Sequence, residues 1–174
     1  MMWISIGLGA AMATILIVIV SLLTGGTANA TFPPESLDGT VLPALHLPGL
    51  AVGTVNGPWT TGRPAVVVFY ASWCAPCTEE LPRVATWEKT HDTGAVRFIG
   101  IDSNDIRSKG FAFARWAKVA FASAFDANGT SASGTFHIAA LPDTVFVDAT
   151  GKVVHTVIGP VTNHQLAVGV SELR

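Results

Sequence analysis

The two cysteines of this chain, Cys74 and Cys77, lie between a predicted buried strand and a predicted helix. The run from Ala65 to Tyr70 is β-branched and aromatic throughout, which is typical of a strand buried on both faces. A helix is predicted over about residues 75–89. Because the start of a helix has unpaired N–H groups and partial positive charge, it stabilises a thiolate placed there. The pattern therefore indicates a redox site in which the two sulfurs alternate between a disulfide and free thiols.

Three other uses of such a cysteine pair can be compared with redox chemistry. A structural zinc site needs about four ligands, and the five histidines (46, 91, 137, 155 and 164) show no metal-ligand spacing. A purely structural disulfide across so short a loop would constrain the unfolded chain little. A c-type haem site needs histidine directly after the second cysteine, where this chain has Thr78. The haem site is excluded, redox chemistry is favoured over the other two, and we expect no metal and no cofactor beyond the cysteine pair.

The first 30 residues are expected to direct the rest of the chain across a membrane. No charged side chain precedes Glu35, and the apolar run from Met2 to Leu23 is long enough to cross a bilayer as a helix. The sequence Ala28-Asn29-Ala30 fits a signal-peptide cleavage site. Residues 1–30 are thus a signal peptide or, slightly favoured by their length, a membrane anchor. In either case residues 31–174 would lie outside the cytoplasm, in an oxidising compartment where a third cysteine could mispair.

The exported part is expected to form one domain over residues 40–174, preceded by a linker over residues 31–39 that ends a stretch, residues 24–39, rich in glycine, threonine, proline and alanine. The chain of 174 residues has a net charge of −2 and no basic patch. Nucleic-acid binding therefore has no electrostatic support.

The order of predicted elements is that of an α/β fold with a mixed sheet. Early elements alternate strand and helix, which favours parallel pairs, and the last two strands form an antiparallel hairpin. A helix is expected to begin at Ser103 or Asn104, and the last helix to begin at Thr162 with Gln165 completing a capping box. The remaining predictions are a hairpin within 40–56, strands at 96–101, 121–125, 143–148 and 152–158, and a short helix within 128–136.

Two separate stretches carry a resemblance to a known family: Phe69 to Pro82, which contains both cysteines, and Ala140 to Asp148. With these motifs the chain resembles the thioredoxin superfamily over roughly residues 35–174. Within it, the chain is similar to the bacterial membrane-tethered or secreted thiol–disulfide oxidoreductases that serve cytochrome c maturation, the TlpA/ResA/CcmG group. The resemblance implies a three-layer fold with a central mixed sheet flanked by helices, preceded here by an N-terminal hydrophobic helix.

The resemblance also implies residue roles. Cys74 would be the exposed nucleophile and Cys77 the buried resolving thiol. Pro142 would be a cis-proline facing the disulfide, so that the backbone of Leu141 can pair with an extended substrate peptide. Trp73, expected to cover the cysteine pair, and Pro76 would complete the substrate-binding surface.

The chain departs from relatives at several positions near these residues. Cytoplasmic thioredoxins carry a buried aspartate six residues before the first cysteine, where this chain has Val68, which cannot transfer a proton. Glu80 occupies the acidic position that members serving cytochrome c maturation carry after the second cysteine. We hypothesise that Glu80, three residues after Cys77 and on the same helix face, raises or relays the proton of Cys77. The alternative is a solvated helix charge. Ala140 and Asp143 replace the glycine and threonine that relatives often have.

The function predicted from this combination is an extracytoplasmic thiol–disulfide oxidoreductase. It would reduce disulfides of client proteins such as apocytochrome c, receive electrons from a membrane donor protein, and act at the bacterial cell membrane or as a secreted protein. An alternative function is that of an oxidase that forms disulfides in exported proteins, which would use the same two cysteines. A copper chaperone is a different class of function that would use the same thiols, but all three methionines lie in the first 12 residues. A thiol peroxidase is a third alternative.

Overall fold

A computed structural model describes residues 36–174 of the chain. The predicted N-terminal hydrophobic helix, the signal peptide or anchor over residues 1–30 and most of the linker lie outside these residues. Within residues 36–174 none of the helices combines the length and the apolar character that a membrane span requires. Chain packing is established before residue 40, because Leu37 is buried and Gly39 N–H donates to the carbonyl oxygen of Val153.

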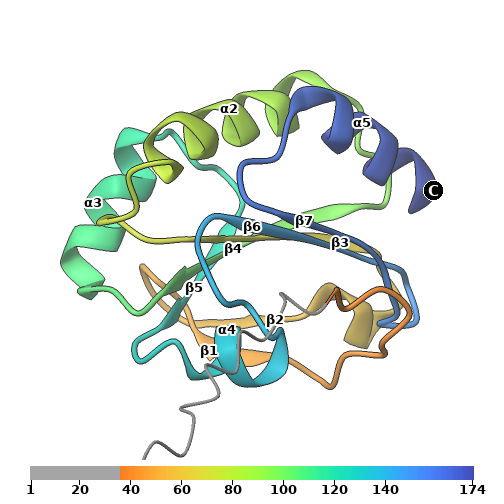
Figure 1. Cartoon of the computed structure of the whole chain (residues 1–174), viewed down its shortest axis with the longest axis horizontal. Helices are drawn as coiled ribbons and strands as arrows, with labels where there is room; N and C mark the ends of the chain where they lie inside the picture. The colour runs from red at the N-terminus through yellow and green to blue at the C-terminus, as the bar shows by residue number, and fades with distance from the viewer. Residues whose placement is uncertain (1–35) are drawn as a thin grey trace, which may run out of the picture. The chain divides into compact units, whose positions relative to one another are not determined.

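The described elements alternate along the chain as Figure 1 shows. The strands are β1 (His46–Pro48), β2 (Thr54–Asn56), β3 (Ala65–Tyr70), β4 (Arg97–Ser103), β5 (Ala122–Asp126), β6 (Asp143–Val147) and β7 (Val153–Ile158). The helices are the 3-10 helix η1 (Pro58–Thr61) and the α-helices α2 (Cys77–Thr90), α3 (Arg107–Trp116), α4 (Thr130–Thr135) and α5 (Asn163–Glu172).

A five-stranded sheet with the order β5-β4-β3-β6-β7 forms the centre of the domain. Strand β3 pairs in parallel with β4, and β4 in parallel with β5, whereas β6 runs antiparallel to both β3 and β7. The predicted mixed sheet, with early parallel pairs and a late antiparallel hairpin, is confirmed. The small hairpin of β1 and β2 is confirmed as well.

Strand β3 is buried on both faces, as predicted, and its side chains alternate between two apolar cores. Val66, Val68 and Tyr70 lie in a core shared with α2, α3 and α5. Ala65, Val67 and Phe69 lie in a second core shared with the β1–β2 hairpin, η1 and α4. Figure 1 shows α2 and α5 on one side of the sheet, and α4 with the hairpin on the other. This arrangement is the expected thioredoxin-like layering of helices on a central sheet.

The predicted start of α3 was wrong. Ser103 is the last residue of β4 and pairs with Asp126 of β5, so it is not free to cap a helix. Asn104 has a left-handed backbone, with φ of 53°, a conformation that asparagine tolerates. Helix α3 begins only at Arg107. Strand pairing has therefore displaced the local capping signal at the end of β4.

The capping box at the start of α5 is confirmed. The Thr162 side chain accepts from Gln165 N–H, and the Gln165 side chain accepts from Thr162 N–H. Such a box replaces helix hydrogen bonds that the first turn cannot make. It fixes the segment just before α5, and this segment contacts the redox helix α2.

Candidate active site

Cys74 and Cys77 form a disulfide at the start of α2, directly after the central strand β3. Pro76 occupies the N-cap position and Cys77 is the first residue of the helix. The backbone N–H of Cys77 donates to Cys74 Sγ at 3.3 Å. This N–H is one of the helix donors without a carbonyl partner, so it can stabilise negative charge on Cys74 when the disulfide opens.

The expectation of an exposed Cys74 was wrong for this disulfide-bonded state. Cys74 is 3% exposed and Cys77 is 0% exposed. Both belong to the core beneath α2, and Cys74 closes a turn in which its N–H donates to the carbonyl oxygen of Ala71. The turn and the bond to Cys77 hold the Cys74 sulfur against the core, which leaves only a small part of it accessible.

Glu80 is buried on α2, one turn after Cys77, with an exposed fraction of 1%. Its Oε1 accepts a hydrogen bond from Val161 N–H at 2.8 Å. Arg83, three residues later, donates from Nη2 to the carbonyl oxygen of Val161. The two side chains thus bind both polar groups of one peptide residue just before α5. Glu80 is not a solvated helix charge.

Burial raises the pKa of Glu80 to about 7, because water no longer solvates its carboxylate. The Val161 N–H and the Arg83 guanidinium favour the carboxylate and limit the rise in this pKa. A carboxyl group with such a pKa gains and loses a proton near neutral pH. That property suits proton exchange with a buried thiol.

Asp143, the first residue of β6, is a second buried carboxyl group close enough to raise the pKa of Glu80. Burial raises the pKa of Asp143 itself to about 7, and its Oδ1 accepts from Thr144 N–H. Sequence reasoning placed Asp143 at the substrate groove as a departure from relatives and gave it no catalytic role. The sequence did contain an indication of this burial. Asp143 is a charged residue that directly follows Pro142 at the start of an apolar strand, where its side chain has little access to solvent.

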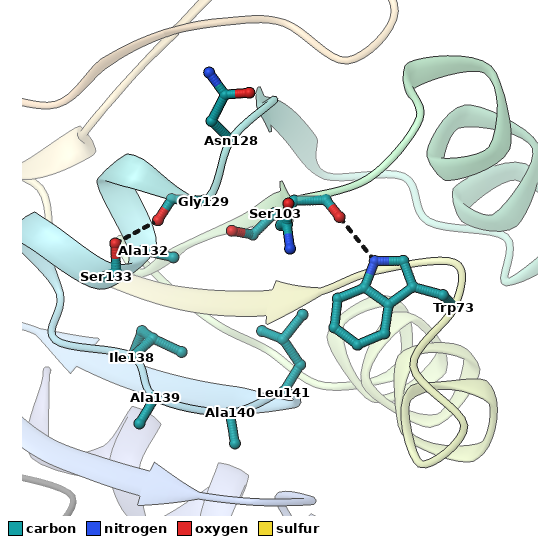
Figure 2. Close-up of a pocket in the computed structure, with 11 residues that line it drawn as sticks. Trp73, Ser103, Asn128, Gly129, Ala132, Ser133, Ile138, Ala139, Ala140 and Leu141 are labelled. Atoms are coloured by element: carbon teal, nitrogen blue, oxygen red, sulfur yellow. Dashed lines mark hydrogen bonds between the residues drawn. The ribbon is translucent and has the colours of Figure 1, made fainter. Parts of the chain in front are cut away.

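The Leu141–Pro142 peptide bond is cis. Leu141 lines a pocket of about 240 Å³ together with Trp73. Figure 2 shows Leu141 directed into this pocket, Trp73 at one end, and Gly129 and Ser133 at the opposite end. Trp73 is 58% exposed, and its indole N–H donates to the carbonyl oxygen of Asn104. The pocket next to the disulfide turn is therefore lined by two of the predicted substrate-binding residues.

Residues 36–174 contain no cluster of three or more histidine, cysteine, aspartate or glutamate side chains arranged to hold a metal ion. His137, which lies five residues before Pro142, has a left-handed backbone with φ of 49°.

Comparison with known proteins adds to this geometry. The AhpC/TSA family model matches residues 39–156, which include the disulfide, Glu80 and Pro142. The chain belongs to the AhpC/TSA family. This assignment and the relatives described next confirm the resemblance that the two sequence motifs indicated.

Three proteins illustrate what this AhpC/TSA-family chain is similar to. It is 30% identical to the thiol-disulfide oxidoreductase ResA of Bacillus cereus over 60% of this chain, and it spans only 60% of that relative's length. It is 25% identical to the thiol:disulfide interchange protein HelX of Rhodobacter capsulatus, over 74% of this chain and 72% of HelX. Among solved structures, DsbF of Mycobacterium tuberculosis matches with a TM-score of 0.66 and 27% identity, over 75% of this chain and 95% of DsbF.

Proposed function

We propose that this AhpC/TSA-family protein is an extracytoplasmic thiol–disulfide oxidoreductase that reduces disulfides in exported client proteins. The observation that carries the proposal is the disulfide between Cys74 and Cys77 at the start of α2, with the Cys77 N–H directed at Cys74 Sγ. This geometry favours Cys74 as the thiolate that attacks, and Cys77, the fully buried first residue of α2, as the thiol that resolves.

The reaction begins from the reduced protein. The Cys74 thiolate attacks one sulfur of the client disulfide, which forms a Cys74–client bond and releases the other client sulfur as a thiolate that takes up a proton. Cys77 then loses its proton and attacks Cys74 Sγ. The bond to the client breaks, the second client sulfur takes up a proton, and the Cys74–Cys77 disulfide is left. Two electrons have moved from the protein to its client.

Glu80 is proposed to accept the proton of Cys77 in the second step. Both side chains lie on the buried face of α2, three residues apart. Water is excluded from this part of the core, so Cys77 needs a protein group to take its proton. The Glu80 carboxylate has a pKa of about 7 and is suited to take up that proton and later return it. Asp143 adds negative charge nearby and raises the proton affinity of Glu80.

The choice of client and electron donor is supported by the sequence resemblance. The group that serves cytochrome c maturation suggests apocytochrome c cysteines as clients and a membrane protein as the donor. The pocket lined by Trp73 and Leu141 would hold the client segment beside the disulfide. An uncharged N-terminal segment of this length would keep the domain at the outer surface of the cell membrane.

The deciding experiment measures the reduction potential of the cysteine pair in the full-length chain by equilibration with glutathione. A value well below about −200 mV supports a reductant, whereas a value near about −120 mV would assign the protein to disulfide formation instead. Cys77→Ser is expected to accumulate a mixed disulfide between Cys74 and a client peptide. Cys74→Ser, which retains the resolving thiol, is the matched control and should form none.

The role of Glu80 is tested separately with Glu80→Gln, which keeps the size of the side chain and removes its charge. We expect the pH profile of the resolving step to lose its inflection near pH 7 and the rate to fall by about 100-fold, the lower end of the usual range for general acid–base catalysis. Glu79→Gln, on the exposed face of the same helix, is the control. An unchanged profile in Glu80→Gln would remove Glu80 from the mechanism.

A further inference from the structure

The turn that carries Cys74 is bound by side-chain and backbone groups just beyond the end of β4. Asp105 accepts hydrogen bonds from Ser72 N–H at 2.5 Å and from the Ser72 hydroxyl at 2.9 Å. The indole N–H of Trp73 donates to the carbonyl oxygen of Asn104 at 2.8 Å, the bond drawn in Figure 2. Ser72 and Trp73 are the two central residues of the turn between Ala71 and Cys74. Both central residues are therefore held by the segment that follows β4.

Asp105 receives a third hydrogen bond, from Ile106 N–H at 2.6 Å. All three of these partners are donors, which matches the carboxylate form of an aspartate. The Asp105 carboxylate is therefore bound by the turn on one side and by the residue just before α3 on the other. No other described side chain links Ser72 to the rest of the domain by a hydrogen bond within residues 36–174.

We propose that Asp105 is a positioning residue that fixes the turn bearing Cys74, and that Asp102 and Asp105 share one proton that keeps this contact intact. The proposal rests on the proposed role of Cys74 as the attacking thiol. Asp105 does not touch the reacting sulfurs, so it would act through Ser72 and Trp73. Its effect would be to hold Cys74 in one orientation when a client disulfide arrives.

The buried carboxyl group of Asp102 extends the contacts of Asp105 beyond the turn. It is 0% exposed, and within the described residues no donor reaches either of its oxygens. Gly110 of α3 packs directly on this carboxyl group, since a Cβ built there would lie only 2.4 Å from Asp102 Cγ. A buried carboxylate without a donor is strongly unfavourable, so the group is stable as the neutral acid. An acid has one O–H to donate, and we assign the neighbouring carboxylate of Asp105, which raises the proton affinity of Asp102, as its acceptor.

The charged and titratable groups around Asp102 support this assignment. Asp105 faces it from the loop, Arg107 from the start of α3 and Tyr70 from β3. Arg107 is engaged elsewhere, because its Nη1 donates to the carbonyl oxygens of Gly49 and Leu50. Lys109 lines the same surface pocket as Asp105.

Burial and the neighbouring Asp105 raise the pKa of Asp102 to about 8. Below this pH the pair carries one proton and one negative charge, as two adjacent carboxyl groups do when both cannot ionise. Above it, the buried anion of Asp102 would face the half-buried anion of Asp105. Their repulsion would separate Asp105 from Ser72 and loosen the turn.

The experiment follows the Trp73 indole N–H by two-dimensional NMR of the full-length chain between pH 6 and pH 9.5, with the signal assigned from Trp73→Phe. In the wild type we expect its chemical shift to move, with a midpoint near pH 8. Asp102→Asn keeps an N–H donor for Asp105 and cannot ionise, so the movement should disappear while the low-pH signal is retained. Glu172→Gln on the exposed surface of α5 is the control and should titrate like the wild type.

A second arm measures reduction of a disulfide peptide by Asp105→Ala and Asp105→Asn. We expect about a tenfold loss of rate for Asp105→Ala, since misplaced reacting atoms can cost up to about 100-fold. Asp105→Asn keeps one acceptor oxygen and should recover at least half of the lost activity. Equal rates for wild type and Asp105→Ala, or an Asp102→Asn signal that still moves near pH 8, would overturn the proposal. If the wild type reduced no disulfide at all, the proposed function would fail, while the NMR arm would still test the shared proton.

Discussion

The disulfide turn lies between two buried acidic regions that differ in the partners of the carboxyl group. On the α2 side, Glu80 is bound by Val161 N–H and lies near Arg83. On the β4 side, Asp102 has no donor among the described residues and faces another acid, Asp105. Burial raises both pKa values, to about 7 and about 8 respectively. Burial alone therefore does not define a role, because the remaining partners decide whether the group exchanges its proton or keeps it.

The largest expected effect is a loss of stability caused by a steric clash at Asp102, on the β4 side of the disulfide turn. In Gly110→Ala the new methyl group would overlap the Asp102 carboxyl group, and the packed core gives little room for either to move. We expect the free energy of unfolding to fall by about 2–3 kcal/mol, the upper range for overpacking. Urea denaturation followed by circular dichroism would measure it.

The control for this substitution is Gly134→Ala in α4, where no atom other than those of the adjoining residues and the nearby helix backbone lies within 4 Å of the new Cβ. Alanine is the better helix former, so this variant should gain up to about 1 kcal/mol. Combining Gly110→Ala with Asp102→Ala should restore most of the lost stability. If the double variant were as unstable as Gly110→Ala alone, contact with the Asp102 side chain would not be the cause.

A smaller effect distinguishes the two acidic regions by the way the free energy of unfolding depends on pH. A buried acid with a raised pKa binds its proton more tightly in the folded state than in the unfolded state, so the free energy of unfolding falls as pH rises between the two pKa values. For Glu80 this interval runs from about 4.5 to about 7, and for Asp102 from about 3.8 to about 8. Glu80→Gln and Asp102→Asn should each remove their part of the fall, and the part removed by Asp102→Asn should be the larger because its interval is wider.

The measurement is chemical denaturation at half-unit steps from pH 4 to pH 9. Glu80→Gln should flatten the curve only up to about pH 7, whereas Asp102→Asn should flatten it to about pH 8. Glu172→Gln, an exposed substitution on α5, is the control and should leave the curve unchanged. A single common interval for both variants would mean that the two regions do not differ as described.

The smallest expected effect concerns Asp143, the second acid on the α2 side. Its charge raises the pKa of Glu80, and this contribution is the smallest of those that act on Glu80. Asp143→Asn should therefore lower the Glu80 pKa by a few tenths of a unit, given how weakly the charges couple at a protein-like dielectric. Carbon-13 NMR of the Glu80 carboxyl group would follow the titration. An unchanged midpoint would show that the two acids titrate independently.

The sequence predicted much of the fold because several of its signals are local. The apolar run of β3 allowed both its bounds and its burial to be predicted, and Thr162 with Gln165 fixed the start of α5. The start of α3 was missed because Ser103, a good cap in isolation, pairs with Asp126 in the sheet. Local preference decides the structure where no distant strand competes for the same backbone groups.

For the site, the sequence by itself determined the chemistry that is available: two cysteines, one turn apart, where a buried strand meets a helix. It also indicated Glu80, through the resemblance to relatives with an acidic residue at this position and through the helix spacing that places Glu80 on the face of Cys77. Only the tertiary structure decided that Glu80 is bound by Val161, that Asp143 lies near it, and that Asp102 and Asp105 support the turn from the other side. These partners come from other strands and helices, and a carboxyl group's proton affinity depends on the burial and charges that folding brings to it.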